Sequence, residues 1–303
     1  MKTCYNQEKW TKGETNVWQE MIQIDGPYNF DMVLDRLSMD PLNALNLEKR
    51  TITVPIRLEG EPNTATVTAT GTTEQPSFVI ELESGDKERI INRLGEVFQW
   101  EVPLKDIHEH FGKTDLNVIF EEHVGTPLIL DFDPFGCLLK CIIHQQLNMA
   151  FAIKLTERFV KKYGFEKNGA WFYPDPEKVA ELTVEELREL QFSGRKAEYV
   201  IDIAKAVTEG GLDLEEIKHE DEQVIFDKLI KIRGIGAWTI QNFLLFGLGR
   251  QNLFPMADIG IQNALKKLYQ LERKPTQEEM EKYKTGWEPY LSYASLYLWR
   301  SIE

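Results

Sequence analysis

The spacing of apolar residues divides the chain into two parts with different secondary structure. Up to about residue 100, short segments rich in β-branched residues alternate partly between apolar and polar positions, which predicts strands at 20–24, 51–58, 64–71 and 77–82. Two amphipathic helices are predicted between these strands, at 29–38 and 86–99. We therefore expect an N-terminal α+β domain with a mostly antiparallel sheet.

From about residue 103 onward, apolar residues recur every three or four positions, which is the period of an α-helix. Strand signals nearly vanish in this part. Thr183 with Glu186, and Thr276 with Glu279, each fit the capping box that begins a helix. The apolar period predicts helices at 135–147, 149–163, 194–208, 222–232, 237–248, 259–269 and 286–302.

The predicted fold class is α+β, with an α+β domain followed by an all-helical part of two lobes. The N-terminal domain covers residues 1–102. One helical lobe is expected to combine 103–134 with 253–303, and the other to cover 135–252. No internal repeat or low-complexity segment interrupts this organisation.

The composition is that of an ordinary globular protein of 303 residues, with 42% apolar and 28% charged residues. No apolar run is long enough for a membrane span, and the N-terminal MKTCYNQEKW lacks the core of a signal peptide. We therefore expect a cytoplasmic monomer with no membrane partner. Cys4, Cys137 and Cys141 are too few for a disulfide framework or a metal quartet, so no metal and no cofactor are expected.

A formal net charge of −14 argues against a protein that holds nucleic acid through a broad basic surface. The cations are not evenly spread, however, and a local patch is compatible with a negative total. The clustered cations are Lys154, Arg158, Lys161 and Lys162 in one segment, Arg195 and Lys196 in a second, and Lys231 and Arg233 in a third.

A short connection with two glycines joins the helices predicted at 222–232 and 237–248. Gly234 and Gly236 allow a tight turn in which Ile235 packs between the helices. With their amides uncovered by side chains, such a loop can bind a phosphate oxygen through backbone N–H groups alone. The alternative is a plain connection in which the glycines only permit the turn.

Four segments together resemble the helix-hairpin-helix DNA glycosylase superfamily: IRGIGAWTIQNFLL at 232–245, IIHQQLNMAFAIKLTERFVKKYG at 142–164, FSGRKAEYVIDIAKAVTEG at 192–210 and GWEPYLSYASLYLW at 286–299. The resemblance is closest to bacterial 3-methyladenine DNA glycosylase II, the AlkA type. It implies a base excision repair hydrolase that flips alkylated purines out of double-stranded DNA and cuts the N-glycosidic bond. No cofactor is implied.

The resemblance places the hairpin glycines of the family at Gly234 and Gly236, and its catalytic aspartate at Asp258, twenty-two residues after Gly236. A carboxylate near C1′ in a water-poor site stabilises the positive charge that develops on the sugar when the base leaves. Asp258 also precedes the apolar pattern IGIQNALKKL and so fits a helix N-cap. Both roles can hold together, because a cap fixes the carboxylate rigidly.

Trp238 stands where superfamily members that also nick the strand carry a nucleophilic lysine. The resemblance therefore implies a monofunctional enzyme without lyase activity. No cysteine follows Cys141, so the iron–sulfur cluster of some members is not expected. Two other functions remain open: a non-catalytic helix-hairpin-helix DNA-binding protein, and a bifunctional glycosylase/lyase that acts on oxidised purines.

Aromatic side chains near these motifs are candidates for holding a flipped, electron-poor base by stacking. Trp238, Trp287 and Tyr290 are the preferred candidates, and the two tryptophans rank highest because the family places pocket tryptophans on those segments. Tyr293 and Trp299 are further candidates. Aromatic residues at helical spacing can equally belong to the core.

The gap left by a flipped nucleotide has to be filled by a protein side chain. The resemblance assigns that role to the loop after the first long helix, with Gln145, Gln146 and Leu147 as candidates. Gln146 stands where the AlkA type has leucine, which leaves the choice open. The other expected DNA contacts are Arg195, Arg233, Gly234, Ile235 and Gly236.

Overall fold

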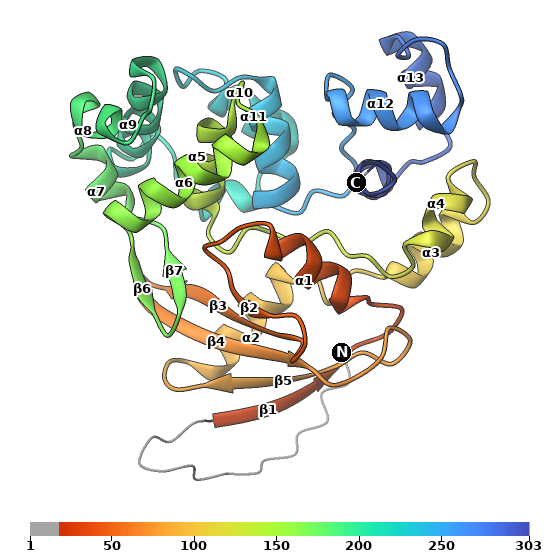
Figure 1. The fold of residues 1–303 in the computed structure, drawn as a ribbon, viewed down its shortest axis with the longest axis horizontal. Coiled ribbons are helices and arrows are strands. Elements are labelled where there is room, and N and C mark those ends of the chain that lie inside the picture. Colours follow the sequence, from red (N-terminus) through yellow and green to blue (C-terminus); the bar gives the residue numbers. More distant parts are fainter. Residues whose placement is uncertain (1–17, 303) are drawn as a thin grey trace.

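The computed structural model describes residues 18–302 and shows a sheet lobe below two groups of helices (Figure 1). The sheet has five antiparallel strands in the order β1-β5-β4-β3-β2. This arrangement confirms the α+β fold class. The strands are β1 (Trp18–Gln23), β2 (Ala44–Asn46), β3 (Thr51–Leu58), β4 (Glu61–Ala69) and β5 (Ser77–Leu82).

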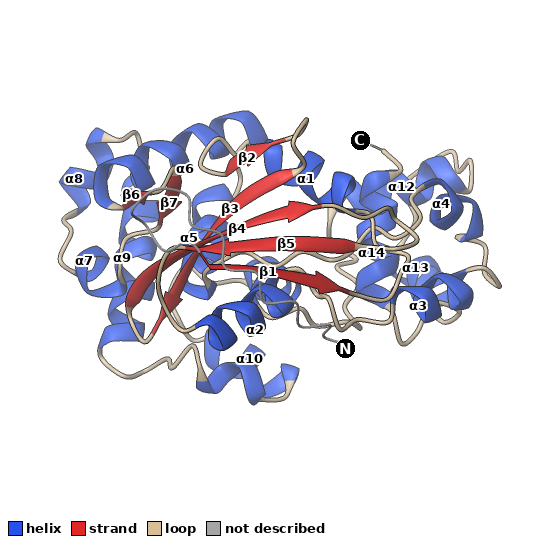
Figure 2. Ribbon diagram, turned by 90° about the horizontal axis from the view of Figure 1, so that it is seen from below, coloured by secondary structure: helices blue, strands red, loops and turns tan. Residues whose placement is uncertain are grey.

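One face of this sheet is buried, because apolar side chains alternate along its strands. Ile52 and Val54 of β3, for example, point into the same core as Phe78 and Ile80 of β5. Helices α1 (Phe30–Ser38) and α2 (Lys87–Val97) contribute apolar side chains to that core. Figure 2 shows the opposite face of the sheet turned toward the viewer, with helices behind it and on both sides.

The rest of the described chain is mainly helical, as the apolar spacing predicts. Both predicted capping boxes are present, at the starts of α8 and α13. None of the helices between residues 18 and 302 is long and apolar enough to cross a membrane. The helices are α3 (Leu104–Phe111), α4 (Asn117–Glu122), α5 (Pro134–His144), α6 (Met149–Tyr163), α7 (Pro176–Ala180), α8 (Val184–Glu189), α9 (Gly194–Thr208), η1 (Glu216–His219), α10 (Glu222–Leu229), α11 (Ala237–Asn242), η2 (Phe243–Gly247), α12 (Ile259–Leu268), α13 (Gln277–Lys284) and α14 (Leu291–Arg300).

A two-stranded hairpin, β6 (Phe165–Lys167) with β7 (Ala170–Phe172), interrupts the helices. The prediction of a nearly strand-free C-terminal part missed it, although Asn168-Gly169 is a strong hairpin signal. Both residues have positive φ, 52° and 81°, as a tight two-residue turn requires. The β6–β7 hairpin also contacts the sheet lobe, because the Asn168 side-chain amide donates to Thr64 Oγ1 at 2.8 Å.

The buried apolar side chains form two clusters. One cluster joins the sheet lobe to the helices at 104–122 and to the C-terminal helices α12 and α14. The other lies within the hairpin lobe, which comprises α5 to η2, with Leu42 as its contribution from the sheet lobe. The first core therefore runs from the sheet lobe to α12 and α14, and the hairpin lobe has a core of its own. The three-unit division predicted from sequence stays a prediction.

Candidate active site and DNA-binding hairpin

Asp258 is the N-cap of α12, and its side chain is held by two donors on one oxygen. Oδ1 accepts from the Ile261 amide at 3.0 Å and from the Trp299 indole Nε1 at 2.9 Å. Oδ2 accepts no hydrogen bond from any residue between 18 and 302. The carboxylate is therefore fixed through one oxygen, and its other oxygen is open to a ligand.

Two neighbours whose contact with Asp258 was not predicted surround the carboxylate. Trp299 was only a further pocket candidate, yet it is the residue on α14 that orients the carboxylate. Gly260 lets the two side chains approach, since a Cβ there would lie 2.9 Å from Asp258 Oδ1 and 3.0 Å from Trp299 Cδ1. The available signal was a glycine within the predicted helix 259–269, because glycine is a poor helix former.

A cleft of about 1200 Å³ separates the sheet lobe from the helices and contains Asp258 in its wall. Trp238 and Asn242 of α11, Phe246 of η2 and Trp299 of α14 also line it. The Phe246 and Trp299 rings are 6.0 Å apart, and the Arg36 guanidinium lies 4.5 Å from the Phe246 centroid. The carboxylate thus shares the cleft with aromatic rings that can stack on a base.

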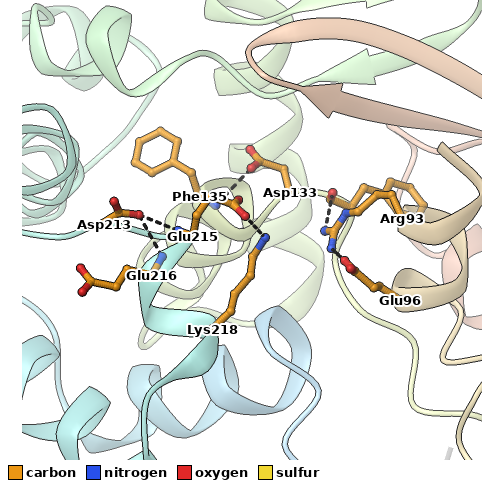
Figure 3. A network of polar contacts seen from close by, with 9 residues as sticks. Arg93, Glu96, Asp133, Phe135, Asp213, Glu215, Glu216 and Lys218 are labelled. Atoms are coloured by element: carbon orange, nitrogen blue, oxygen red, sulfur yellow. Dashed lines mark hydrogen bonds and ion pairs between the residues drawn. The ribbon is translucent and has the colours of Figure 1, made fainter. Parts of the chain in front are cut away.

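Most charges elsewhere in the cleft wall are already paired within the protein. Figure 3 shows two such ion pairs, Arg93 with Glu96 at 2.7 Å and Lys218 with Glu215 at 2.6 Å. The same view shows Asp133, the N-cap of α5, whose oxygens accept from the amides of Phe135 and Gly136. These groups therefore leave little free charge at their end of the cleft.

Two basic side chains of α5, Lys140 and His144, also line the cleft. Burial is the largest single influence on the pKa of Lys140 and lowers it, but the ion pair with Asp131, together with Cys137 and Asp40, raises it above the ordinary value. Burial, assisted by Lys140, lowers the pKa of His144 to about 4, so that imidazole is neutral at neutral pH. The lysine is accordingly held as an ammonium ion, which is not nucleophilic.

The predicted hairpin is present between α10 and α11, and its two glycines differ. Gly234 has φ +87°, and a Cβ there would lie 2.1 Å from the Tyr199 ring, so the fold requires glycine. At Gly236, by contrast, a Cβ would meet nothing within 4 Å. Neither amide finds an acceptor among residues 18–302. Ile235 is 5% exposed and packs into the hairpin lobe as expected.

The wedge candidates lie beside this hairpin and have different surroundings. The Gln145 amide donates to Gly234 O at 2.9 Å and to Thr239 Oγ1 at 2.8 Å, so it braces the hairpin. Leu147 is half-buried and packs against the hairpin-lobe core. Gln146 is exposed, has φ +56° and lines a hollow beside Gly234 and Gly236. Gln146 is thus the most accessible of the three.

The basic clusters offer fewer free, exposed cations than their sequence positions suggest. Arg233 pairs with Glu198 and lies 3.7 Å from Asp202. Lys196 is buried rather than on the surface. The exposed cations that form no ion pair or hydrogen bond within residues 18–302 include Arg195, Lys154 and Lys231.

The preferred aromatic residues do not lie together. Trp238 is 36% exposed and lines the cleft. It also lines a separate hollow beside the hairpin, whose wall includes Gln145, Gln146, Tyr199, Gly234 and Gly236. Trp287 is fully buried, donates to Asp115 Oδ1 at 2.8 Å and is not part of the cleft wall. Tyr290 packs edge-on against His110 and also lies outside the cleft wall. The structure therefore brings neither Trp287 nor Tyr290 into the cleft wall, and their role in holding a base stays a prediction.

The fold and the site together define a helix-hairpin-helix protein with a carboxylate in an aromatic cleft. Comparison with known proteins agrees: residues 139–289 match the family described as "HhH-GPD superfamily base excision DNA repair protein". The Bacillus subtilis protein named "Putative DNA-3-methyladenine glycosylase YfjP" is 54% identical over 95% of this chain and 100% of its own length. The B. subtilis DNA-3-methyladenine glycosylase is 33% identical over 73% of this chain and 75% of its own length.

A solved structure shares the whole architecture, sheet lobe included. The 3-methyladenine DNA-glycosylase from Archaeoglobus fulgidus superposes with a TM-score of 0.80 at 24% identity, covering 92% of this chain and 97% of its own. The chain therefore belongs to the HhH-GPD superfamily of base excision DNA repair proteins and is a DNA glycosylase.

Proposed function

We propose that this glycosylase removes alkylated purines of the 3-methyladenine and 7-methylguanine type from double-stranded DNA by hydrolysis, and leaves an abasic site without cutting the strand. The observation that carries the proposal is Asp258, whose Oδ1 is fixed by Ile261 and Trp299 while Oδ2 is open. The names of the two B. subtilis relatives support this substrate class.

The chemistry requires little more than this carboxylate. An alkylated purine already carries positive charge, so it can leave as a neutral base when the bond from C1′ to nitrogen breaks. Asp258 then stabilises the cationic sugar, and water forms the new bond to C1′ and releases a proton. Trp238 and Trp299 supply rings on which a cationic base can stack in the cleft.

The cleft residues also support hydrolysis without a lyase step. Trp238 occupies the position of the lyase lysine, and the nearby Lys140 is held as an ammonium ion by Asp131. A Schiff base with the sugar requires a neutral amine, which Lys140 does not provide. Borohydride should therefore trap no covalent adduct between the protein and damaged DNA.

The DNA would be held mainly by backbone groups. The free amides of Gly234 and Gly236 can bind a phosphate despite the net charge of −14. Arg195 and Gln146 are both exposed, so Arg195 would add a cation and Gln146 would fill the gap in the duplex. With the hairpin glycines, Arg195 and Gln146 in contact with the duplex, the flipped nucleotide would then enter the cleft that contains Asp258.

The direct test is incubation with methylated duplex DNA followed by chromatography of the released bases. We expect 3-methyladenine and 7-methylguanine from the parent protein and almost none from Asp258→Asn. Absence of base release by the parent, while it still binds duplex DNA, would instead support a non-catalytic DNA-binding role.

A further inference from the structure

Lys196, in the first turn of α9, is a buried ammonium group with no carboxylate beside it. The residue is 9% exposed, and no acidic side chain among residues 18–302 pairs with it. Its Nζ donates to the carbonyl oxygens of Ile142 at 3.0 Å, Ile143 at 2.6 Å and Gln145 at 2.9 Å. An ammonium ion has three donors, so this set uses all of them.

Burial without a neighbouring carboxylate is unfavourable for the charged form of a lysine. Burial lowers the pKa of Lys196 to about 8, which shows that the charged form is disfavoured there. The contacts nevertheless suit the site, because the last carbonyl groups of a helix are unpaired and carry partial negative charge. Lys196 thus caps the C-terminal end of α5 from a neighbouring helix.

The backbone that Lys196 holds leads directly to two predicted DNA contacts. Gln145 supplies one of the three carbonyl groups, and its own side chain reaches Gly234 O and Thr239 Oγ1 of the hairpin. Gln146 follows at once, with φ +56°. One ammonium group therefore fixes both the brace to the hairpin and the loop that presents Gln146.

We propose that Lys196 is a positioning residue that sets the wedge loop, residues 145–147, relative to the hairpin at 233–236, so that both engage the same stretch of duplex. The proposal rests on the DNA-binding part of the proposed function. Lys196 itself does not line the cleft or the hollow beside the hairpin, so it acts through Gln145 and not on the substrate.

The test compares Lys196→Met with the parent in binding to a fluorescein-labelled duplex that contains an abasic-site analogue. Methionine keeps most of the length and apolar volume of the side chain and removes the three donors. We expect the dissociation constant for the duplex to rise about tenfold or more. The variant loses the hydrogen bonds of a charged group, and these bonds position both the wedge loop and the hairpin. Lys196→Arg, which keeps the charge and donors, should recover part of this affinity.

Two controls separate positioning from simple destabilisation. Ile203→Ala removes fully buried volume two turns further along α9 and should lower the melting temperature without weakening DNA binding below that temperature. Gln145→Ala should weaken binding by itself, and combining it with Lys196→Met should add little, because both act on the same brace.

Unchanged binding by Lys196→Met would overturn the proposal, as would a loss no larger than that of Ile203→Ala or losses that add fully with Gln145→Ala. The binding assay does not depend on base release. A parent protein that binds the duplex but releases no methylated base would refute the proposed function and leave the role of Lys196 standing.

Discussion

Two aspartates cap helices that face the same cleft, and they use their oxygens differently. Asp133 begins α5 and accepts from Phe135 N at 3.2 Å through Oδ1 and from Gly136 N at 3.0 Å through Oδ2. Asp258 begins α12 and accepts both of its hydrogen bonds through Oδ1. Both oxygens of the Asp133 carboxylate therefore accept a hydrogen bond from α5. At Asp258 only Oδ1 accepts hydrogen bonds from residues 18–302, so Oδ2 is open to a ligand.

The comparison teaches that a capping position alone does not distinguish a structural acid from a catalytic one. What differs is the second donor, which is an amide of the same helix at Asp133 and the indole of Trp299, from α14, at Asp258. By gathering both donors on one oxygen, Trp299 leaves the other oxygen free. Exchanging each acid for its amide should therefore give opposite results at the two caps.

The largest expected effect is that of Asp258→Asn on base release. Asparagine can still accept from Ile261 and Trp299 through its one oxygen, and it caps helices about as well as aspartate, so the free energy of unfolding should hardly change. The negative charge that we propose stabilises the sugar cation is lost, and we expect single-turnover release of 3-methyladenine to slow by about 100- to 1000-fold. Chemical denaturation of both proteins measures the stability.

The outcome that would contradict this role is near-parental release by Asp258→Asn. A large loss of stability would also count against the comparison, because it would show that the fold uses both oxygens. DNA binding by the variant, measured on an abasic-site duplex, controls for a general loss of function.

The second effect is that of Trp299→Phe, which keeps a ring in the cleft and removes the indole N–H. The hydrogen bond to Asp258 Oδ1 is then lost, and the carboxylate is free to turn. We expect base release to fall about tenfold, because a hydrogen bond to a charged group is worth about 1.5 kcal/mol and about 1.4 kcal/mol corresponds to a tenfold change. Phe246→Leu, which alters the neighbouring ring and leaves this hydrogen bond intact, is the control. An equal loss in both variants would point to stacking as the cause.

The third effect separates the two hairpin glycines. Gly236→Ala meets no neighbour and has ordinary backbone angles, φ −112° and ψ 175°, so the fold should be retained or slightly stabilised. The added methyl group lies where DNA backbone would approach, and we expect the affinity for duplex DNA to fall about fivefold. Gly234→Ala should instead unfold the protein more easily, because Tyr199 occupies the space. Undiminished DNA binding by Gly236→Ala would exclude close contact there.

Much of the fold could be predicted because its signals are local. Apolar spacing gave the long helices and four of the five sheet strands, and Thr183 and Thr276 marked helix starts that the structure confirms. The β6–β7 hairpin was missed because strands of three residues are too short to show alternation. The Asn168-Gly169 turn was the signal to use.

The site was predicted less completely, because its details depend on contacts between distant segments. The resemblance to the glycosylase family singles out Asp258, but the orientation of its carboxylate depends on Trp299, 41 residues away. Trp287 and Tyr290 lie on a segment rich in aromatics, and spacing does not show which rings face the cleft. Lys196 reads as a surface cation beside Arg195, although the fold buries it over the end of α5.

The smallest expected effect completes the comparison at the other cap. Asp133→Asn keeps one acceptor oxygen and replaces the other with an amide nitrogen, so either Phe135 N or Gly136 N loses its partner. We expect the free energy of unfolding to fall by about 1 kcal/mol, since α5 loses part of its cap, while base release stays at the parental rate. Thermal unfolding and single-turnover release measure the two quantities. If Asp133→Asn slowed base release as strongly as Asp258→Asn, both acids would belong to the chemistry, and a free second oxygen would no longer identify the catalytic one.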